Sequence, residues 1–313
     1  MIDMNIRDLK YLVAIADHSH FGMAAEACFV SQPALSMQIK KLEGVLGVQL
    51  IERTTKSALL TEIGKLMTEH ARDILYRVEA MKEAAKEAKD PYSGELHLGV
   101  IPTLAPYLLP HIIPSLTKIF PKLSIFLVED QTPNLLTKLK QRKLDGALVG
   151  LPLIHDDFFA LPLFEEEFLL ALPPNHPLSK RKSIRISDLE NKVLLLLEDG
   201  HCMRDFALEL CYRAKASEAK GFQATSLETL RHMVASKAGI TLMPKLAIKP
   251  NDGVSYLPFH SPKPARIVGM VWRSSSAKKI LLESIVAHIR KSMAKQKAVK
   301  VIHTPILCHK TSK

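Results

Sequence analysis

The segment with the clearest capacity for chemistry runs from Glu198 to Asp205 and is followed by a second cysteine, Cys211. The thiolate is the reactive form of cysteine. Cys202 has His201 and Arg204 as neighbours and stands where a helix is expected to begin, and all three features favour a thiolate there. A thiolate that attacks peroxide becomes a sulfenic acid, which a second thiol condenses to a disulfide. Cys202 is therefore a candidate peroxidatic thiol and Cys211 a candidate resolving thiol.

The spacing of these two cysteines constrains any such mechanism. If residues 202–211 are helical, nine residues rise about 13.5 Å, and the two side chains point from opposite faces. A disulfide requires Cα atoms less than about 7 Å apart. The bond cannot form unless the segment unwinds, which is the coupling between chemistry and shape that a sensor needs.

Other interpretations of the cysteines remain open. Two buried small hydrophobic residues are the usual fate of free cysteines. A zinc site is disfavoured because the eight-residue gap does not match common ligand spacings, and we expect neither a metal nor a cofactor. Cys28 is expected in a core and Cys308 in an exposed tail, and in a reducing compartment structural disulfides are not expected.

From Leu96 onward, strand patterns alternate with helical patterns, which is typical of a mostly parallel sheet. The predicted strands cover residues 96–101, 123–129, 145–149, 168–172, 193–197, 221–225, 240–243, 254–259 and 266–272. A final helix is predicted over residues 277–294. The order predicts two small α/β lobes, with the chain returning to the first.

Residues 4–89 are instead predicted to be almost entirely helical. Ser31 is a good N-cap and Pro33 suits the first turn of a helix that ends near Gly47, and residues 50–60 resemble a short hairpin. Two helices joined by a turn and followed by a hairpin form a candidate winged helix-turn-helix, although an ordinary three-helix packing unit would show the same pattern. The candidate DNA contacts are Ser31, Gln32, Pro33, Ser36, Gln38 and Lys40 on the second helix and Arg53, Thr54 and Lys56 on the hairpin.

A long helix is predicted over residues 62–89, where Met67, Ile74, Met81 and Ala88 repeat every seven residues. Such a repeat suggests a helix that pairs with another copy. Asp90 to Gly94 breaks it. The predicted organisation is a DNA-binding domain (1–61), a linker helix for dimerisation (62–89), a hinge (90–94), a regulatory domain (95–296) and a basic tail (297–313). Within the regulatory domain, lobe 1 covers about 95–165 and 266–296, and lobe 2 about 166–265.

The composition excludes several classes of protein. The chain has 313 residues, of which 47% are hydrophobic and 24% charged, which rules out a disordered chain, a collagen and a small disulfide scaffold. No apolar run approaches the roughly 18 residues of a membrane helix, and no signal peptide is recognised, so we expect a cytoplasmic protein. Residues 263–313 hold 12 basic residues and one acidic residue, so they carry the whole net charge of +11. A basic end of this kind is typical of a solvated tail.

The N-terminal motifs resemble the signature of LysR-type transcriptional regulators. The similarity lies in residues 21–27, 30–36, 39–43 and 46–53, and it is dense over about the first 65 residues. It implies a whole-chain architecture of winged helix-turn-helix, linker helix, hinge and a two-lobe α/β effector domain similar to periplasmic binding proteins.

The segment Gly200 to Asp205, with Cys211, resembles the sensing loop of the peroxide-responsive branch of that family, as do residues 101–103, 107–114 and 224–231. This resemblance implies the two thiol roles given above and a peroxide pocket lined by Thr103, Thr132 and His201. Both threonines also follow predicted strands and precede helices, where ligands bind in open α/β sheets, although capping is the plainer role for Thr132. Arg204, Asp205 and Arg266 complete the predicted pocket.

The resemblance therefore predicts an activator of the peroxide stress response, not an enzyme, that a reversible Cys202–Cys211 disulfide switches. The expected partners are double-stranded promoter DNA, hydrogen peroxide, further copies of the chain (a dimer of dimers, hence a homotetramer) and RNA polymerase, with no membrane. Two alternatives remain: a LysR-type regulator of a small organic effector with structural cysteines, and a thiol peroxidase. Titration of free thiols before and after a low concentration of peroxide distinguishes the first alternative from the predicted sensor. An assay of reductant-dependent peroxide turnover distinguishes the second.

Overall fold

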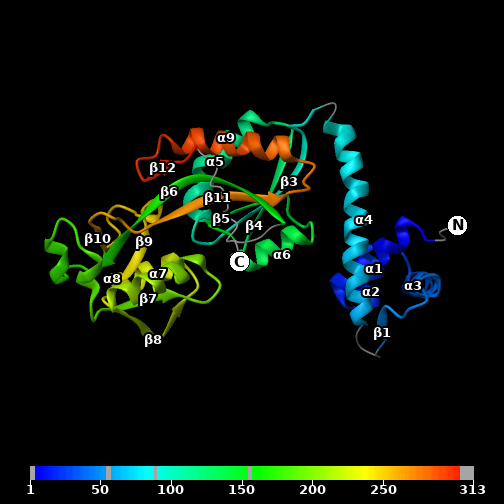
Figure 1. Ribbon diagram of the computed structural model, residues 1–313, viewed down its shortest axis with the longest axis horizontal. Helices are drawn as coiled ribbons and strands as arrows, with labels where there is room; N and C mark the ends of the chain where they lie inside the picture. Colours follow the sequence, from blue (N-terminus) through cyan, green and yellow to red (C-terminus); the bar gives the residue numbers. More distant parts are fainter. Residues whose placement is uncertain (1–3, 54–57, 88–89, 154–156, 304–313) are drawn as a thin grey trace, which may run out of the picture. The chain divides into compact units, whose positions relative to one another are not determined.

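The computed structural model describes residues 4–53, 58–87, 90–153 and 157–303. Contacts along the chain divide it into two compact units, residues 1–90 and 91–313. In Figure 1 the first unit runs from blue to cyan, and the second continues through green and yellow to red. Within the described residues, no helix is long and apolar enough to cross a membrane.

The first unit is a helical domain with a two-stranded hairpin. Ser31 caps the third helix by accepting a hydrogen bond from the Ala34 N–H at 3.4 Å, and Gly47, at φ +69°, ends it. The Thr61 hydroxyl accepts from the Gly64 N–H at 2.9 Å and so caps the long helix that follows. The elements are α1 (Ile6–His18), α2 (Phe21–Ala27), α3 (Gln32–Leu46), β1 (Ile51–Arg53), β2 (Ala58–Leu60) and α4 (Glu62–Glu87). The apolar faces of α1, α2 and α3 meet in one core.

The second unit begins with the first α/β lobe. In its sheet, β3 pairs in parallel with β4 and β5, and β11 closes the other edge of β5 in the antiparallel sense. Helices α5 and α9 cover one face of this sheet and α6 covers the other (Figure 1). The elements are β3 (Gly94–Val100), α5 (Ala105–Ile119), β4 (Leu123–Glu129), α6 (Thr132–Lys140), β5 (Gly146–Leu151), β11 (Ala265–Arg273) and α9 (Lys279–Met293). Their buried side chains form one cluster, called here the lobe 1 core.

The second lobe surrounds a separate cluster, called here the lobe 2 core. Its strands β7 and β8 pair in parallel, and β9 and β10 pair with the long strand β6 (Phe158–Leu172). The elements are β7 (Val193–Leu197), α7 (Cys202–Ala214), β8 (Ser217–Ala224), α8 (Leu227–Ala235), β9 (Thr241–Pro244) and β10 (Ser255–Pro258), with short 3₁₀ turns at Pro177–Lys180, Ile186–Leu189 and Lys245–Ala247. Together with the helical domain, these two lobes confirm the predicted fold class.

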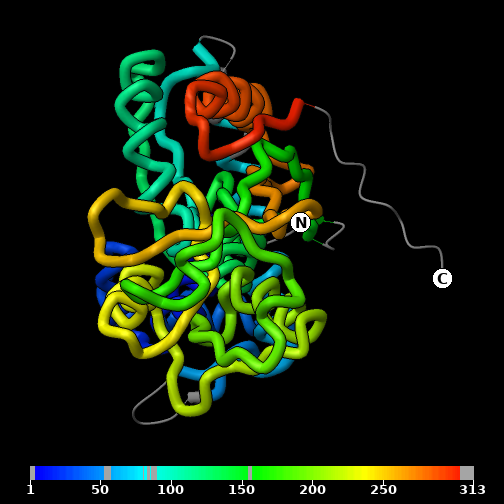
Figure 2. Tube along the Cα trace, turned by 90° about the vertical axis from the view of Figure 1, so that its left-hand side faces the viewer, coloured from blue at the N-terminus to red at the C-terminus, as the bar shows by residue number. Residues whose placement is uncertain are grey.

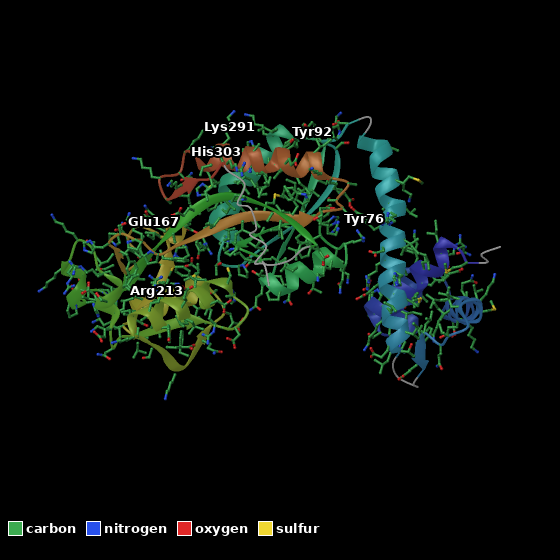
Figure 3. All side chains as sticks on the ribbon, viewed as in Figure 1. Tyr76, Tyr92, Glu167, Arg213, Lys291 and His303 are labelled. Atoms are coloured by element: carbon green, nitrogen blue, oxygen red, sulfur yellow. The ribbon has the colours of Figure 1, made fainter. Side chains whose placement is uncertain are left out.

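Strand β6 (Phe158–Leu172) is longer than the predicted strand over residues 168–172 and passes through both lobes. Phe164 lies in the lobe 1 core and Phe168 in the lobe 2 core. Between them, Glu167, labelled in Figure 3, pairs with Lys245 and Lys263 at 3.3 and 2.9 Å. Glu166 likewise pairs with Arg266, so two of the three consecutive glutamates have cationic partners in the folded chain.

The prediction that residues 297–313 form a solvated tail is wrong for its first part. Strand β12 (Val299–Val301) pairs antiparallel with residues 164–166 of β6, and the Ile302 N–H donates to the Leu163 carbonyl at 2.9 Å. In Figure 2 this red segment lies beside α9. The edge of β6 offers free backbone groups, and Val299 and Val301 supply apolar side chains that pack on the lobe 1 core. Residues 304–313 lie outside the described residues.

This strand predicts different results for two truncations. A chain that ends after Gln296 loses the β12 hydrogen bonds and the packing of two valines, and we expect a loss of about 1–3 kcal/mol of unfolding free energy. A chain that ends after His303 keeps β12 and should match the full chain in urea unfolding. Equal stability of the two truncated chains would show that β12 contributes nothing to the fold.

Candidate functional site

The two candidate redox cysteines share helix α7 but belong to different cores. Cys202 begins the helix, is half-buried and packs against the lobe 1 core. Cys211, 4% exposed, lies in the lobe 2 core. The Sγ of Cys202 faces β5, since a Cβ built on Gly150 would lie 3.1 Å from it. Nine helical residues separate the cysteines by about 13.5 Å, so a disulfide requires α7 to unwind and at least one of the two cysteines to leave its place.

The burial of Cys211 predicts unequal reactivity of the two thiols. Burial, with a contribution from Glu218, raises the pKa of Cys211. In the reduced protein near pH 8 we expect iodoacetamide to modify Cys202 at least about tenfold faster than Cys211, because both thiolate fraction and access limit alkylation. Timed alkylation followed by peptide mass spectrometry measures both rates. Denaturant should bring the rates together, and equal rates in the folded protein would contradict this arrangement.

His201 lies directly before Cys202 and is 4% exposed. Burial lowers its pKa, against a smaller upward effect of Glu198, whose Oε1 lies 3.8 Å from the His201 Nε2. At neutral pH the imidazole is therefore neutral. A neutral imidazole can donate one hydrogen bond to a small ligand and accept another from it. It does not supply the positive charge expected beside the thiol.

Arg204 holds the loop before α7 in place. Its Nε donates to Asp199 Oδ1 at 2.7 Å, its Nη1 to the Leu197 carbonyl at 2.9 Å, and its two Nη atoms bind the Glu218 carboxylate at 2.5 and 3.0 Å. The guanidinium is thus paired with two carboxylates. Asp205, in contrast, is exposed in the first turn of α7, where a carboxylate complements the helix dipole. The structure gives Arg204 and Asp205 places outside the group of buried hydroxyls predicted to bind peroxide.

Thr132 presents an unused hydroxyl at the start of α6. It is 9% exposed, and its Oγ1 is buried without a hydrogen-bond partner among the described residues. Gln131, not Thr132, occupies the N-cap position. The structure therefore gives Thr132 no capping role. A buried hydroxyl without a partner costs free energy, so this site favours a small polar ligand.

Thr103 is oriented by a buried ion pair. The Arg266 Nη1 donates to the Thr103 hydroxyl at 2.9 Å and the Nη2 to the Thr103 carbonyl at 3.1 Å. The Arg266 Nε donates at 2.7 Å to Glu166, whose side chain is fully buried and also accepts from the Leu246 N–H at 2.8 Å. A threonine hydroxyl that accepts from arginine keeps its own proton free to donate. Arg266 therefore orients this hydroxyl, a role consistent with its predicted place beside the pocket.

A polar cleft of about 420 Å³ opens between the lobes. Its lining comes from the end of β4, the segments after β3, β4 and β8, the start of α6 and the loop before α7: Pro102, Glu129, Asp130, Gln131, Asn134, Glu198, His201 and Thr225. Among the described residues, no group of three or more His, Cys, Asp or Glu side chains is placed to hold a metal ion. The cleft suits a small polar molecule that approaches His201.

The predicted DNA-reading residues lie along α3. Ser31, Gln32, Pro33 and Lys40 are exposed and Ser36 is half-buried. The Gln38 side chain is already engaged, since its Nε2 donates to Asp8 Oδ1 at 2.6 Å and so ties α3 to α1. The Arg53 side chain, Thr54 and Lys56 lie outside the described residues.

The sequence did not point to four residues of this candidate site. Glu166 orients Arg266, Glu218 binds Arg204, Gly150 makes room for the Cys202 sulfur, and Gln131 donates to the loop before α7. In the sequence, the pair Asp199–Gly200 is typical of a turn and so indicates a constrained loop near Gln131's partners. None of the four residues themselves carries such a local signal. They act through partners distant in the sequence.

Family models match both parts of the chain. Residues 6–65 match the bacterial regulatory helix-turn-helix protein of the lysR family, and residues 89–294 match the LysR substrate binding domain. The chain belongs to the LysR family of bacterial regulatory proteins, as the sequence motifs predicted.

Two relatives are named as regulators of gene expression. The DNA-binding transcriptional dual regulator OxyR of Escherichia coli K12 is 49% identical over 293 residues, which are 93% of this chain and 96% of that protein. The hydrogen peroxide-inducible genes activator of Haemophilus influenzae is 46% identical over 276 residues, which are 87% and 92% of the two chains.

Two solved structures resemble the whole chain. Full-length OxyR from Pseudomonas aeruginosa, a variant, has a TM-score of 0.78 and 36% identity, covering 92% of this chain and 95% of that one. A hydrogen peroxide-bound mutant of Corynebacterium glutamicum OxyR has a TM-score of 0.64 and 34% identity, covering 93% and 92%. The similarity therefore extends over both the DNA-binding and the regulatory parts.

Proposed function

We propose that this protein is a DNA-binding transcriptional activator that senses hydrogen peroxide through a reversible Cys202–Cys211 disulfide. One observation supports it most directly: the two cysteines stand on one helix, but Cys202 packs against the lobe 1 core and Cys211 lies in the lobe 2 core. A bond between them must rebuild the contact between the lobes. The names of the relatives, OxyR and hydrogen peroxide-inducible genes activator, agree with this activity.

The proposed chemistry proceeds in two balanced steps. The Cys202 thiolate attacks one peroxide oxygen, the O–O bond breaks, and the departing hydroxide takes a proton and leaves as water. This step gives a sulfenic acid at Cys202, with the Thr103 and Thr132 hydroxyls and His201 holding the peroxide oxygens. The Cys211 sulfur then attacks the Cys202 sulfur, the S–O bond breaks, and a second water leaves. One peroxide and two thiols yield one disulfide and two waters.

The decisive experiment combines thiol counting with DNA footprinting. Free thiols are counted before and after about one equivalent of peroxide, and the footprint on promoter DNA is recorded in both states. Loss of two thiols together with a changed footprint supports the proposal. A small organic effector with structural cysteines predicts unchanged thiols. A thiol peroxidase instead predicts many peroxides consumed per protein whenever a reductant is supplied.

DNA reading is assigned to α3 and the hairpin. Exposed Gln32 can form two hydrogen bonds with a base edge, whereas Ser31, Ser36 and Lys40 reach phosphates. Pro33 fixes the first turn of α3 that presents them. Arg53, Thr54 and Lys56 are proposed to contact the groove or the backbone.

Gln32→Ala should weaken binding to the specific promoter site by about 1–3 kcal/mol and leave binding to random DNA almost unchanged, because a base contact is lost. Lys56→Ala should weaken binding to all sequences and reduce its dependence on salt. Fluorescence titration at several salt concentrations measures both effects. If Gln32→Ala lowered affinity for random DNA by the same factor, Gln32 would be a phosphate contact.

Further partners follow from α4 and from the proposed activity. Leu66, Ile74 and Met81 on this helix are 47, 40 and 71% exposed, and such a face suits a second copy of the helix. We infer a homo-oligomer, a dimer of dimers, that contacts RNA polymerase at the promoter. A thiol switch that acts on promoter DNA belongs in the cytoplasm, where thiols are kept reduced.

A further inference from the structure

A glutamine of lobe 1 holds the loop of lobe 2 that carries the peroxidatic cysteine. The Gln131 Nε2 donates to Glu198 Oε1 at 3.2 Å and to the Asp199 carbonyl at 3.1 Å. Both partners can only accept, so both amide protons are used and the orientation of the amide is fixed. These hydrogen bonds cross between the lobes three and four residues before Cys202.

The loop is shaped to receive this amide. Gly200 has φ +90°, a conformation that residues with a Cβ rarely adopt. A Cβ at this position would also collide with the Gln131 amide oxygen. Gly200 therefore permits both the turn of the loop and the close approach of Gln131.

The hydrogen bonds of Gln131 differ in kind from those of Arg204 to the same loop. Arg204 binds Asp199, Leu197 and Glu218 within lobe 2. Gln131 instead joins this loop to lobe 1. Cys202 is half-buried whereas Cys211 lies in the lobe 2 core, so Cys202 is the cysteine that we take to move when the disulfide forms. The loop before it then moves as well, and the hydrogen bonds from Gln131 are lost.

We propose that Gln131 is a positioning residue that stabilises the dithiol form and thereby sets how readily the Cys202–Cys211 disulfide forms. The proposal rests on the proposed function. An interaction present in only one of two states shifts their equilibrium by its own free energy. In a glutathione buffer the two thiols give up two electrons and two protons, and one oxidised glutathione accepts them and becomes two glutathione thiols.

The test measures this equilibrium in the full-length protein without peroxide. The wild type, Gln131→Leu and Gln131→Glu are equilibrated at a series of glutathione ratios, quenched with acid, alkylated and analysed by mass spectrometry. Loss of two hydrogen bonds in Gln131→Leu should raise the disulfide equilibrium constant about fivefold, which is about 20 mV. Gln131→Glu places a second carboxylate opposite that of Glu198. The repulsion should raise the disulfide equilibrium constant about tenfold, which is about 30 mV.

Asn134→Leu is the matched control. Asn134 lies on the same helix and lines the same cleft, but its Nδ2 donates at 2.8 Å to Asp130 within lobe 1. This variant should keep the wild-type constant within about twofold. At the reducing end of each titration, Cys211 should resist alkylation equally in all variants, which shows that the lobe 2 core is intact.

Three results would overturn the proposal: a wild-type constant for Gln131→Leu, an equal shift for Asn134→Leu, or increased alkylation of Cys211 in the reduced Gln131 variants. The last would mean that the shift comes from a loosened core. A wild-type protein that forms no Cys202–Cys211 disulfide at any glutathione ratio would instead refute the proposed function itself.

Discussion

Cys202→Ser is expected to abolish both sulfenic acid formation and the transcriptional response to peroxide. Serine does not ionise at neutral pH, so it offers no nucleophile, and its side chain is close in size to that of cysteine. The packing beside Gly150 should persist, because a smaller oxygen replaces the sulfur there. The effect should therefore be a loss of at least about a hundredfold in the oxidation rate without unfolding.

Cys211→Ser should separate the two steps. This variant should still react with peroxide and accumulate the sulfenic acid at Cys202, or a mixed disulfide, because only the resolving thiol is missing. A dimedone-type probe with mass spectrometry detects the trapped species. The assigned roles fail if the probe labels Cys211 in Cys202→Ser as fast as it labels Cys202 in Cys211→Ser. They also fail if the double variant responds normally to peroxide.

The second large effect is expected at Arg266. Arg266→Met removes the guanidinium that Glu166 and Thr103 share. It leaves the Glu166 carboxylate, which is 0% exposed, without its counter-charge. Breaking a buried ion pair by removing one partner costs about 3–5 kcal/mol of unfolding free energy. The Thr103 hydroxyl also loses the donor that orients it, and misplacement of a binding group can reduce a rate by about 100-fold.

A double variant separates these two consequences. Arg266→Met with Glu166→Gln removes both charges and keeps an amide oxygen to accept from the Leu246 N–H. We expect this pair to regain most of the unfolding free energy but not the rate of Cys202 oxidation, measured by probe labelling in a Cys211→Ser background. If the rate returned together with the stability, Arg266 would serve the fold and not the pocket.

Local patterns predicted the elements that form from neighbouring residues. Strands β4 and β7 have the predicted bounds, and α7 begins at Cys202. Periodicity and capping residues are sufficient to predict such elements, because the residues that define each one lie within a single short segment of the sequence. The cysteine spacing was interpretable for the same reason, since helical geometry fixes the distance between residues 202 and 211.

The groups that orient the site could not be predicted because their partners are distant in the chain. Three consecutive glutamates, residues 165–167, interrupt the apolar pattern, and for this reason the part of β6 before residue 168 was not predicted. Glu166 becomes a buried residue only because Arg266, 100 residues later, pairs with it. Likewise Gln131 meets Glu198 across 67 residues. Such pairings form only when the lobes are folded, and no periodic pattern in the sequence indicates them.

The short separation of Cys202 and Cys211 in the sequence also bears on how the proposed disulfide is reduced again. A disulfide stabilises a fold largely through the loop-closure entropy it removes from the unfolded chain, and a loop of about ten residues gains slightly less than about 3 kcal/mol. Against this gain stand the packing of Cys202 on lobe 1 and the hydrogen bonds around the loop, which oxidation gives up. Opposing terms of similar size keep the disulfide within reach of cellular thiols. The same two cysteines placed a hundred residues apart would close a far larger loop and form a more permanent crosslink.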